Sequence, residues 1–184
     1  MPQRPVTELR TARLLLRPPE PRDLEPFALM CADPEVMEHI GLGRPLDRAS
    51  AELGFATLLE RWRRDGAGLF TVVRLEDDAY LGFAGTAPVP QHSVAGGETE
   101  VGWRLRRSAW GVGVATEAAR AVLADVVDRR PDARVVALIR PANARSRRVA
   151  EKLGLVEETT GAGPRGETVV VYGGQAAACS IQSR

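Results

Sequence analysis

The chain has 184 residues, a length that fits one domain of ordinary size. Its 25 basic and 24 acidic side chains leave a formal net charge of +1, whereas nucleic-acid binders usually carry a clear basic excess. No apolar run approaches the roughly 20 residues needed to span a bilayer, and the first ten residues contain no apolar signal segment. We therefore expect no nucleic-acid partner, no membrane association and a cytoplasmic location.

The first half of the chain is predicted to contain a strand, three helices and a three-strand meander. Residues 13–17 form a short apolar run that two prolines close, which indicates a strand. Residues 21–31 place apolar side chains at helical spacing, residues 33–39 can form a second short helix, and Asp47 is a plausible N-cap for a helix to about residue 64. Residues 69–75, 80–89 and 98–105 follow as strands.

The second half is predicted to alternate helices and strands. Residues 113–128 carry an apolar stripe that is typical of a helix packed on a core. A strand over residues 133–139 precedes a helix over residues 143–153, and Gly154 suits the left-handed position that follows a helix. Residues 155–160 and 167–172 are the last expected strands. We expect one domain over residues 1–173 and a disordered tail over residues 174–184.

Thiol and metal chemistry have little support in the sequence. The two cysteines, Cys31 and Cys179, are far apart in the chain, and free thiols are a better interpretation than a disulfide. Histidine, cysteine and acidic residues show no metal-ligand spacing, so we expect no metal.

The segment from residue 100 to residue 117 has a pattern suited to phosphate binding. A predicted strand ends near Leu105, and a turn with two glycines leads into a helix. The first N–H groups of a helix have no internal partner, the helix dipole adds partial positive charge there, and glycine lets the backbone approach a ligand. A plain tight turn is the alternative. The expected backbone donors are Val112, Gly113, Val114, Ala115 and Thr116.

Two familiar phosphate loops do not fit this segment. The P-loop requires Gly-Lys-Ser/Thr at the start of the helix, where this chain has Gly113-Val114-Ala115. The dinucleotide fingerprint requires a third glycine at the position of Thr116, and it belongs to the first unit of a parallel sheet rather than to the end of a meander.

The later helix over residues 143–153 presents a polar group among apolar ones. Asn143 is a natural N-cap, and Ser146 shares one helical face with Val149, Ala150 and Leu153. Ser146 is either a small core residue bonded back to the helix or a hydroxyl that faces a buried ligand.

Taken in order, these segments resemble the GCN5-related N-acetyltransferase (GNAT) superfamily, and more closely its branch that acetylates the N-termini of ribosomal proteins. The matching segments cover most of the chain: TARLLLR at 11–17, DPEVM at 33–37, EVGWRL at 100–105, WGVGVATEA at 110–118, and residues 143–154. The resemblance implies an α+β fold with a mixed, mostly antiparallel central sheet of about six to seven strands and helices on both faces. It also implies acetyl-CoA as co-substrate and an amine as acceptor.

The resemblance further implies where acetyl-CoA binds. The pantetheine arm would lie where strand 101–105 parts from strand 133–139, next to Asn143. The diphosphate would sit on the turn at residues 110–116. Arg147, Arg106 and Arg107 could contact phosphates, with solvated surface charge as the alternative for each. The residues implied to hold the cofactor are Trp103, Arg104, Leu105, Arg106, Trp110, Gly111, Val112, Gly113, Val114, Ala115, Thr116, Asn143 and Arg147.

The expected chemistry is direct attack by the amine in a ternary complex. Glu100 is the candidate base, with Glu98 on the same side of a regular strand as the alternative. Many relatives have a tyrosine acid where this chain has Ala150, so Ser146 is the candidate proton donor to the thiolate. Glu38 and His39 lie in the region that lines the acceptor site in relatives.

Two departures from the wider superfamily leave a second function open. Ser108 stands where relatives often have Gln or Arg, and Ala150 replaces the tyrosine. A non-catalytic acyl-CoA sensor of the same fold is therefore the alternative to an enzyme. The acceptor, a protein N-terminus or a small amine, and a homodimer of the kind common among relatives are left open.

Overall fold

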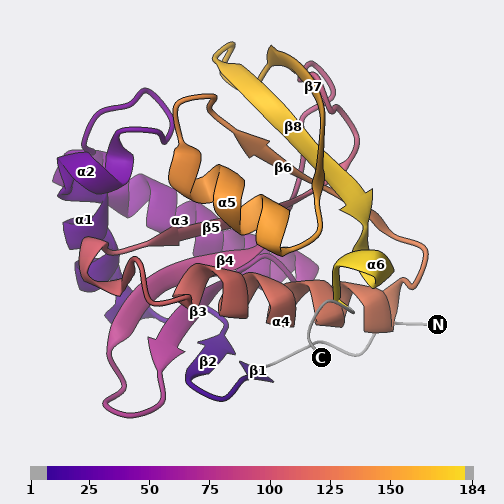
Figure 1. The fold of residues 1–184 in the computed structure, drawn as a ribbon. Coiled ribbons are helices and arrows are strands. Elements are labelled where there is room, and N and C mark those ends of the chain that lie inside the picture. The colour runs from indigo at the N-terminus through magenta and orange to yellow at the C-terminus, as the bar shows by residue number, and fades with distance from the viewer. Residues whose placement is uncertain (1–7, 181–184) are drawn as a thin grey trace. The chain divides into compact units, whose positions relative to one another are not determined.

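The computed structural model describes residues 8–180, which fall into two compact units. The described parts of unit 1 come from Met1–Gly85 and Trp103–Ala118, and those of unit 2 come from Thr86–Gly102 and Ala119–Arg184. Strands β4 (Tyr80–Pro88) and β5 (Thr99–Leu105) and helix α4 (Val114–Arg129) each contribute residues to both units. Figure 1 colours the elements in chain order.

Unit 1 begins with two strands and then three helices. Besides the shared elements β4, β5 and α4, unit 1 contains β1 (Leu9–Arg10), β2 (Leu14–Arg17), the 3-10 helix η1 (Pro21–Asp23), α1 (Leu24–Ala32), α2 (Pro34–Met37), α3 (Arg48–Asp65), β3 (Leu69–Arg74) and the 3-10 helix η2 (Arg107–Ala109). Strands β1 to β4 pair antiparallel in chain order. At the far edge the N–H of Arg106, just after β5, donates to the carbonyl of Leu81 in β4 at 2.9 Å.

Unit 2 contains β6 (Arg134–Ile139), α5 (Ala144–Lys152), β7 (Val156–Ala162), β8 (Thr168–Gln175) and α6 (Ala176–Ser180). Strand β5 pairs parallel with β6 at Thr99↔Val135 and Glu100↔Val136. Strand β6 then pairs antiparallel with β8, and β8 pairs antiparallel with β7. In Figure 1, β8 lies beside β6, although β7 comes between them in the chain.

The fold class agrees with the expectation of a mixed, mostly antiparallel α+β protein. The strand order is β1-β2-β3-β4-β5-β6-β8-β7, and β5–β6 is the parallel pair within the described residues. The eight described strands exceed the expected six to seven because β1, a two-residue strand, pairs with β2 through Leu9↔Leu16. A strand this short has no pattern of its own in the sequence.

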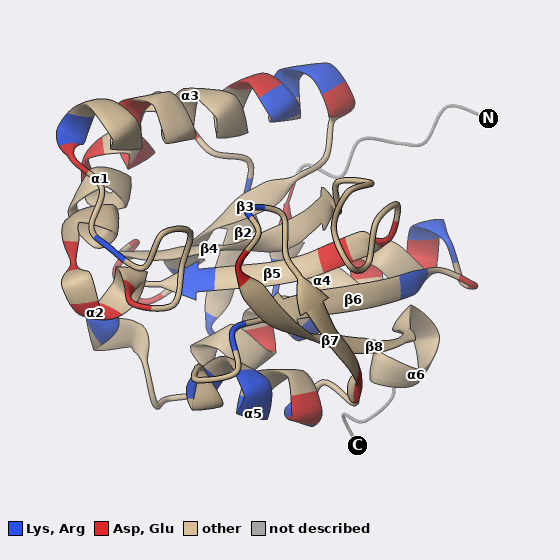
Figure 2. Cartoon of the chain, turned by 90° about the horizontal axis from the view of Figure 1, so that it is seen from above, with Lys and Arg blue, Asp and Glu red and all other residues tan. Residues whose placement is uncertain are grey.

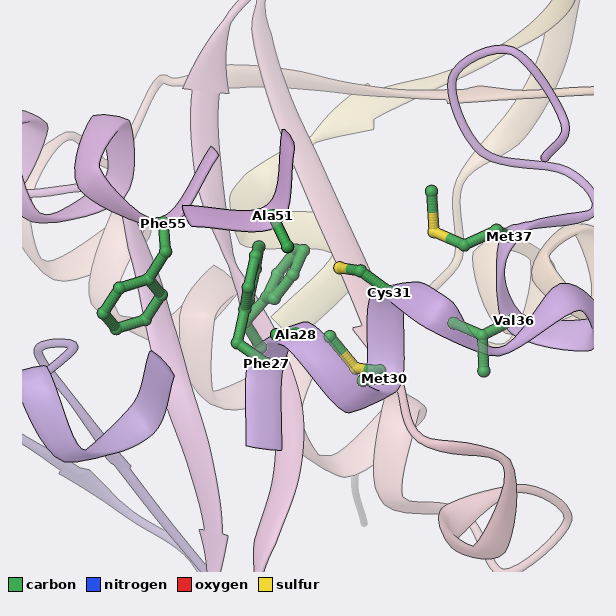
Figure 3. Packing of buried hydrophobic residues seen from close by; sticks show 9 residues of the cluster. Phe27, Ala28, Met30, Cys31, Val36, Met37, Ala51 and Phe55 are labelled. Carbon is green, nitrogen blue, oxygen red and sulfur yellow. The ribbon is translucent and has the colours of Figure 1, made fainter. Parts of the chain in front are cut away.

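A cluster of buried side chains from α1, α2, α3 and β4 forms a core in unit 1. The ring of Phe27 lies 5.3 Å from that of Phe55 and 6.0 Å from that of Phe83, distances at which aromatic pairs attract each other. Figure 3 shows these helices meeting through their apolar side chains. The helices are placed by local signals: Asp47 Oδ1 accepts from the Ser50 N–H at 2.7 Å, and Gly66 ends α3 at φ 61°.

The chain end differs from the disorder expected over residues 174–184. Residues 174 and 175 complete β8, and α6 follows with Ala176 and Cys179 almost fully buried. Residues 181–184 lie outside the described part of the chain, and the expected single domain over residues 1–173 stays a prediction. Cys31 and Cys179 are both free thiols, as expected.

In the span from residue 8 to residue 180, none of the helices is both long enough and apolar enough to cross a bilayer.

Candidate functional site

The turn between η2 and α4 has a backbone that requires glycine. Gly111 and Gly113 adopt φ angles of +79° and +84°, a region that residues with a Cβ rarely adopt. A Cβ on Gly111 would meet none of the described atoms within 4 Å, so the conformation, and not crowding, explains this glycine. Val112 between them is 59% exposed. The turn therefore presents its backbone to solvent in a shape fixed by two glycines.

The start of α4 adds hydrogen-bond donors to this turn. The first bond into the helix runs from the Glu117 N–H to the Gly113 carbonyl at 3.0 Å. The N–H groups of Val114, Ala115 and Thr116 precede that bond and have no acceptor within the helix. With the positive end of the helix dipole beside them, they form a site suited to an anion such as a phosphate.

Trp110 attaches the turn to the rest of unit 1. Its indole Nε1 donates to the Leu105 carbonyl at 2.9 Å, and its ring packs against the buried cluster of α1, α2 and α3. The Arg107 guanidinium lies 5.0 Å from the centre of the Trp110 ring and also pairs with Glu35. The turn is thus anchored on its strand side by an aromatic side chain.

Arg106 is bound to groups of the protein. Its Nε donates to Ser108 Oγ at 2.6 Å and its Nη1 donates to the Tyr80 carbonyl at 3.1 Å. Ser108 therefore accepts a bond from an arginine of the same turn. Both expected arginines, Arg106 and Arg107, lie beside the turn and already have protein partners.

The backbone of β5 divides its groups between two edges. The Arg106 N–H and the Arg104 carbonyl face β4, since a Cβ on Gly82 would lie 2.1 Å from that carbonyl. By strand alternation the backbone groups of Trp103 and Leu105 face the opposite edge, where the Leu105 carbonyl accepts from Trp110. The Arg104 side chain donates to Cys31 Sγ at 3.4 Å and lies over the Phe83 ring.

Glu100 is the half-buried carboxyl of β5 in unit 2. Burial raises the pKa of Glu100 to about 7, against the opposing effect of the Leu138 backbone N–H. Two residues along the same face, a Cβ on Gly102 would meet none of the described atoms within 4 Å. Burial thus raises the pKa of Glu100, and the next position on the same strand face, Gly102, leaves room for a ligand atom.

Glu98, the alternative base, has a different environment. Its Oε1 lies 3.2 Å from Arg134 Nε, and Arg134 also pairs with Glu158. The choice of Glu100 over Glu98 as the base stays a prediction.

The start of α5 carries two of the expected residues. Asn143 Oδ1 accepts from the Ser146 N–H at 3.1 Å, so Asn143 is the expected N-cap. Within residues 8–180 its amide NH₂ is left for another acceptor. Ser146 is partly buried in the first turn of the helix. These two residues are brought together in unit 2.

Arg147 is directed toward β7 and β8. Its Nε donates to the Tyr172 hydroxyl at 2.8 Å and its Nη2 donates to Glu157 at 3.1 Å. Figure 2 shows that α5 carries acidic as well as basic residues, so the helix is not a purely basic surface. A phosphate could therefore be contacted only by Arg147 N–H groups that Tyr172 and Glu157 do not use.

The expected acceptor residues follow α2 in unit 1. His39 is partly buried and Glu38 is exposed, with 3.7 Å between His39 Nε2 and Glu38 Oε2. Both lie in the segment between α2 and α3. No hydrogen bond between the two is shown by this distance.

One arginine at the turn was missed by the sequence reasoning. Arg13 Nη1 donates to the Val112 carbonyl at 3.0 Å, and its Nε donates to Glu117 at 2.8 Å. In the sequence, Arg13 stands out only as part of the segment TARLLLR, which matches the family but does not indicate what Arg13 contacts. The partners are about a hundred residues away in the chain.

Comparisons with known proteins give consistent results. The acetyltransferase (GNAT) domain family matches residues 13–156. The uncharacterized protein YkkB of Bacillus subtilis is 35% identical over 151 residues, which cover 81% of this chain and 85% of YkkB. The FsC-acetyl coenzyme A-N(2)-transacetylase of Aspergillus fumigatus is 31% identical over 156 residues, 83% of this chain and 66% of that protein. An acetyltransferase structure from Agrobacterium tumefaciens has a TM-score of 0.74 at 28% identity and covers 92% of this chain and 95% of its own.

Proposed function

Because the chain belongs to the acetyltransferase (GNAT) family, we propose that it transfers the acetyl group of acetyl-CoA directly to a primary amine in a ternary complex. The family supplies the donor and the reaction class, acyl transfer from acetyl-CoA. The acceptor is either a protein N-terminal amine or a small-molecule amine. The likeness to the ribosomal-protein branch stays a prediction.

The observation that carries this proposal is the environment of Glu100. An alkyl ammonium has a pKa of about 10 and cannot attack a thioester until it loses a proton. A carboxyl with a pKa of about 7 is largely ionised just above neutral pH and is a much stronger base than an ordinary glutamate. The open space at Gly102, two residues along the same strand face, would give an acceptor amine room to approach.

The donor is proposed to bind through backbone groups. The N–H groups from Val112 to Thr116 would hold the diphosphate, because the glycine turn and the helix start both favour an anion there. Trp103 and Leu105 would pair with the pantetheine amides through the groups that face away from β4. Arg104 faces β4 and is not part of this contact.

Two side chains of α5 complete the proposal. The Asn143 amide NH₂ would donate to a pantetheine carbonyl, since its oxygen is already used as the helix cap. The Ser146 hydroxyl would protonate the thiolate that leaves when the amine attacks the acetyl carbon. No acyl-enzyme is formed: the ammonium gives one proton to Glu100, the amine nitrogen then bonds to the acetyl carbon, and the C–S bond breaks. Ser146 gives its proton to the sulfur, and the second proton of the nitrogen, lost as the amide forms, restores the Ser146 hydroxyl.

The acceptor is proposed to approach through the segment that contains Glu38 and His39. The relative from Aspergillus fumigatus is named for transfer of acetyl to an N(2) position, which supports a nitrogen acceptor. The exposed Glu38 carboxylate suits an acceptor that carries a positive charge.

An acceptor screen tests the function. The purified chain is mixed with acetyl-CoA and a panel of peptides with varied first residues and of small amines, and free thiol is measured together with the mass of the acceptor. We expect thiol release that depends on one acceptor class and a product heavier by one acetyl group. Glu100→Gln should slow turnover, and Glu52→Gln, at an exposed position of α3, should not. Tight acetyl-CoA binding without turnover on any amine would support the sensor function instead.

A further inference from the structure

We propose that Arg13 is a positioning residue that prepares the turn at residues 111–116 for a diphosphate by holding the Val112 carbonyl and neutralising the Glu117 carboxylate. The inference rests on the proposed function, because it assumes that this turn binds the diphosphate of acetyl-CoA. Arg13 lies in the link between β1 and β2, and all the groups involved belong to unit 1.

The contacts around Glu117 form a complete set. Arg13 Nε and Nη2 lie 2.8 and 2.6 Å from Glu117 Oε2, and the Arg13 backbone N–H donates to Oε1 at 3.1 Å. The Thr11 hydroxyl donates to the same Oε1 at 2.5 Å. Four donors from a three-residue segment therefore surround one carboxylate.

This segment is itself fixed to the sheet. The Leu75 N–H donates to the Arg13 carbonyl at 2.9 Å, and the Thr11 N–H donates to the Leu14 carbonyl at 3.0 Å. The β1–β2 link therefore connects the first strands of the sheet to the start of α4. Because both ends of the contact are anchored, the guanidinium has a defined position over the turn.

The charge of Glu117 explains why an arginine is needed there. Glu117 lies in the first turn of α4, where its negative charge would repel a diphosphate bound to the same helix start. Burial acts to raise the pKa of Glu117, but the hydrogen bonds from Thr11 and Arg13 together outweigh it and hold that pKa below its usual value, so the carboxylate is ionised at neutral pH. The Arg13 guanidinium cancels this charge at contact distance. Glu117, the acidic residue of the first turn of α4, is then neutralised next to the amides of the helix start.

The Val112 carbonyl is the second group that Arg13 controls. Val112 lies between two glycines with positive φ, a sequence that would otherwise leave the peptide free to rotate. Arg13 Nη1 holds the carbonyl oxygen at 3.0 Å, and Nη2 lies 3.4 Å from the position a Cβ on Gly113 would take. A carbonyl held by a guanidinium cannot turn toward a bound anion, so the adjacent N–H groups keep their direction.

The test compares two acetyl donors across a mutant cycle. Arg13→Ala, Glu117→Gln and the double variant are assayed with acetyl-CoA and with S-acetylpantetheine, which lacks the diphosphate and the nucleotide. We expect Arg13→Ala to raise KM for acetyl-CoA by about tenfold, a difference of about 1.4 kcal/mol, with kcat at saturation near the wild-type value. KM for S-acetylpantetheine should change by less than about twofold, because that donor has no group for the turn. The double variant should recover the part of the lost affinity that repulsion by Glu117 causes, and the part still missing measures the hold on the Val112 carbonyl.

Arg74→Ala is the matched control. Arg74 forms a bidentate pair with Asp77 in the turn after β3, and its side chain is 44% exposed against 51% for Arg13. Its removal deletes an ion pair of the same type in the same unit and should leave both KM values unchanged. If Arg13→Ala folds poorly, Arg13→Lys serves in its place, because lysine keeps the charge and loses the forked geometry; it should raise KM for acetyl-CoA less than alanine does.

The outcomes separate this inference from the proposed function. Equal rises in KM for both donors, or a double variant as weak as Arg13→Ala, would overturn the positioning role of Arg13. A wild type that uses acetyl-CoA no better than S-acetylpantetheine would instead show that the diphosphate contributes nothing, and the proposed donor site would fail.

Discussion

The indole nitrogen of Trp110 lies 2.9 Å from the carbonyl oxygen of Leu105 and donates a hydrogen bond to it. The bond joins the last residue of β5 to the beginning of the glycine turn. Because the Trp110 ring also packs against the buried cluster of α1, α2 and α3, the turn has a fixed origin in unit 1. The backbone donors that follow Trp110 are therefore held in place by an aromatic anchor.

Trp110→Phe should weaken acetyl-CoA binding more than it destabilises the protein. Phenylalanine keeps most of the packing and removes the donor, so the Leu105 carbonyl loses its partner. We expect KM for acetyl-CoA to rise about fivefold and the free energy of unfolding to fall by about 1 kcal/mol. Steady-state kinetics and urea unfolding measure the two effects.

Trp62→Phe is the control for that prediction. The Trp62 indole donates to the Leu69 carbonyl at 2.8 Å, also within unit 1 and also partly buried, but away from the turn. The loss of stability should be similar and KM should not change. A rise in KM of the same size in both variants would contradict the anchoring role of Trp110.

Gly111→Ala should affect ligand binding beyond its effect on stability. Gly111 and Gly166 have φ angles of +79° and +81°, and a Cβ on either would meet none of the described atoms within 4 Å. Alanine therefore introduces the same backbone strain at both positions, on the order of 1 kcal/mol. Only Gly111 lies in the proposed diphosphate turn.

Gly166→Ala is the control, and thermal unfolding and calorimetry with CoA compare it with Gly111→Ala. Both variants should lose a similar amount of stability, and only Gly111→Ala should bind CoA several-fold more weakly. Equal CoA affinity in the two variants would show that the turn needs glycine for folding alone.

The elements of the fold that have local causes could be predicted from the sequence. Asp47 and Asn143 both cap helices through the backbone N–H three residues on, as their residue types indicate. Strand β1 and helix α6 could not be predicted, because their stability comes from tertiary contacts. Strand β1 exists through its pairing with β2, and α6 through the burial of Ala176 and Cys179.

The candidate site also contains parts that the local sequence predicts and parts that depend on residues far apart in the chain. The glycine turn and the start of α4 follow from residues adjacent in the chain. The Arg13–Glu117 contact joins residues 104 positions apart, and Arg147 binds Tyr172 25 positions away, so no local pattern indicates either. The pKa of Glu100 depends on burial, which its place in a predicted strand does not determine.

Asn143→Asp should separate the cap of α5 from the proposed pantetheine contact. Aspartate keeps an oxygen that can accept from the Ser146 N–H, and its charge suits a helix start, so stability should not fall. It removes the amide NH₂ that we propose as a donor. We expect KM for both acetyl-CoA and S-acetylpantetheine to rise about tenfold, since both contain the pantetheine arm.

The matching control for the cap is Asp47→Asn at the start of α3. There the oxygen that accepts from the Ser50 N–H is also kept, and neither stability nor KM should change appreciably. If Asn143→Asp binds both donors as tightly as the wild type, Asn143 acts as a helix cap and not as a ligand.

Glu100 should control the pH dependence of the rate. As a base, the carboxyl must be ionised, so kcat/KM should rise through an inflection near the pKa of about 7. Glu100→Gln should lose this rise together with most of the rate at pH 7.5, a fall of about a hundredfold. Glu98→Gln should keep the inflection, because Glu98 pairs with Arg134. An unchanged profile in Glu100→Gln would exclude Glu100 as the base.

The raised pKa of Glu100 also predicts that folding stability falls as pH rises, whereas kcat/KM increases. The folded protein holds the Glu100 proton more tightly than the unfolded chain, whose glutamate pKa is 4.5, so folding stability falls as pH rises from about 4.5 to about 7 and stays reduced above that window. Glutamine has no charge to bury. Glu100→Gln should therefore be more stable than the wild type at pH 8, by on the order of 2 kcal/mol, and no more stable near pH 4.5. Thermal unfolding at the two pH values measures the difference, and Glu98→Gln, which breaks an ion pair, should not be stabilised at either. A stability gain for Glu100→Gln that is equal at both pH values would show that burial of the charge is not its cause.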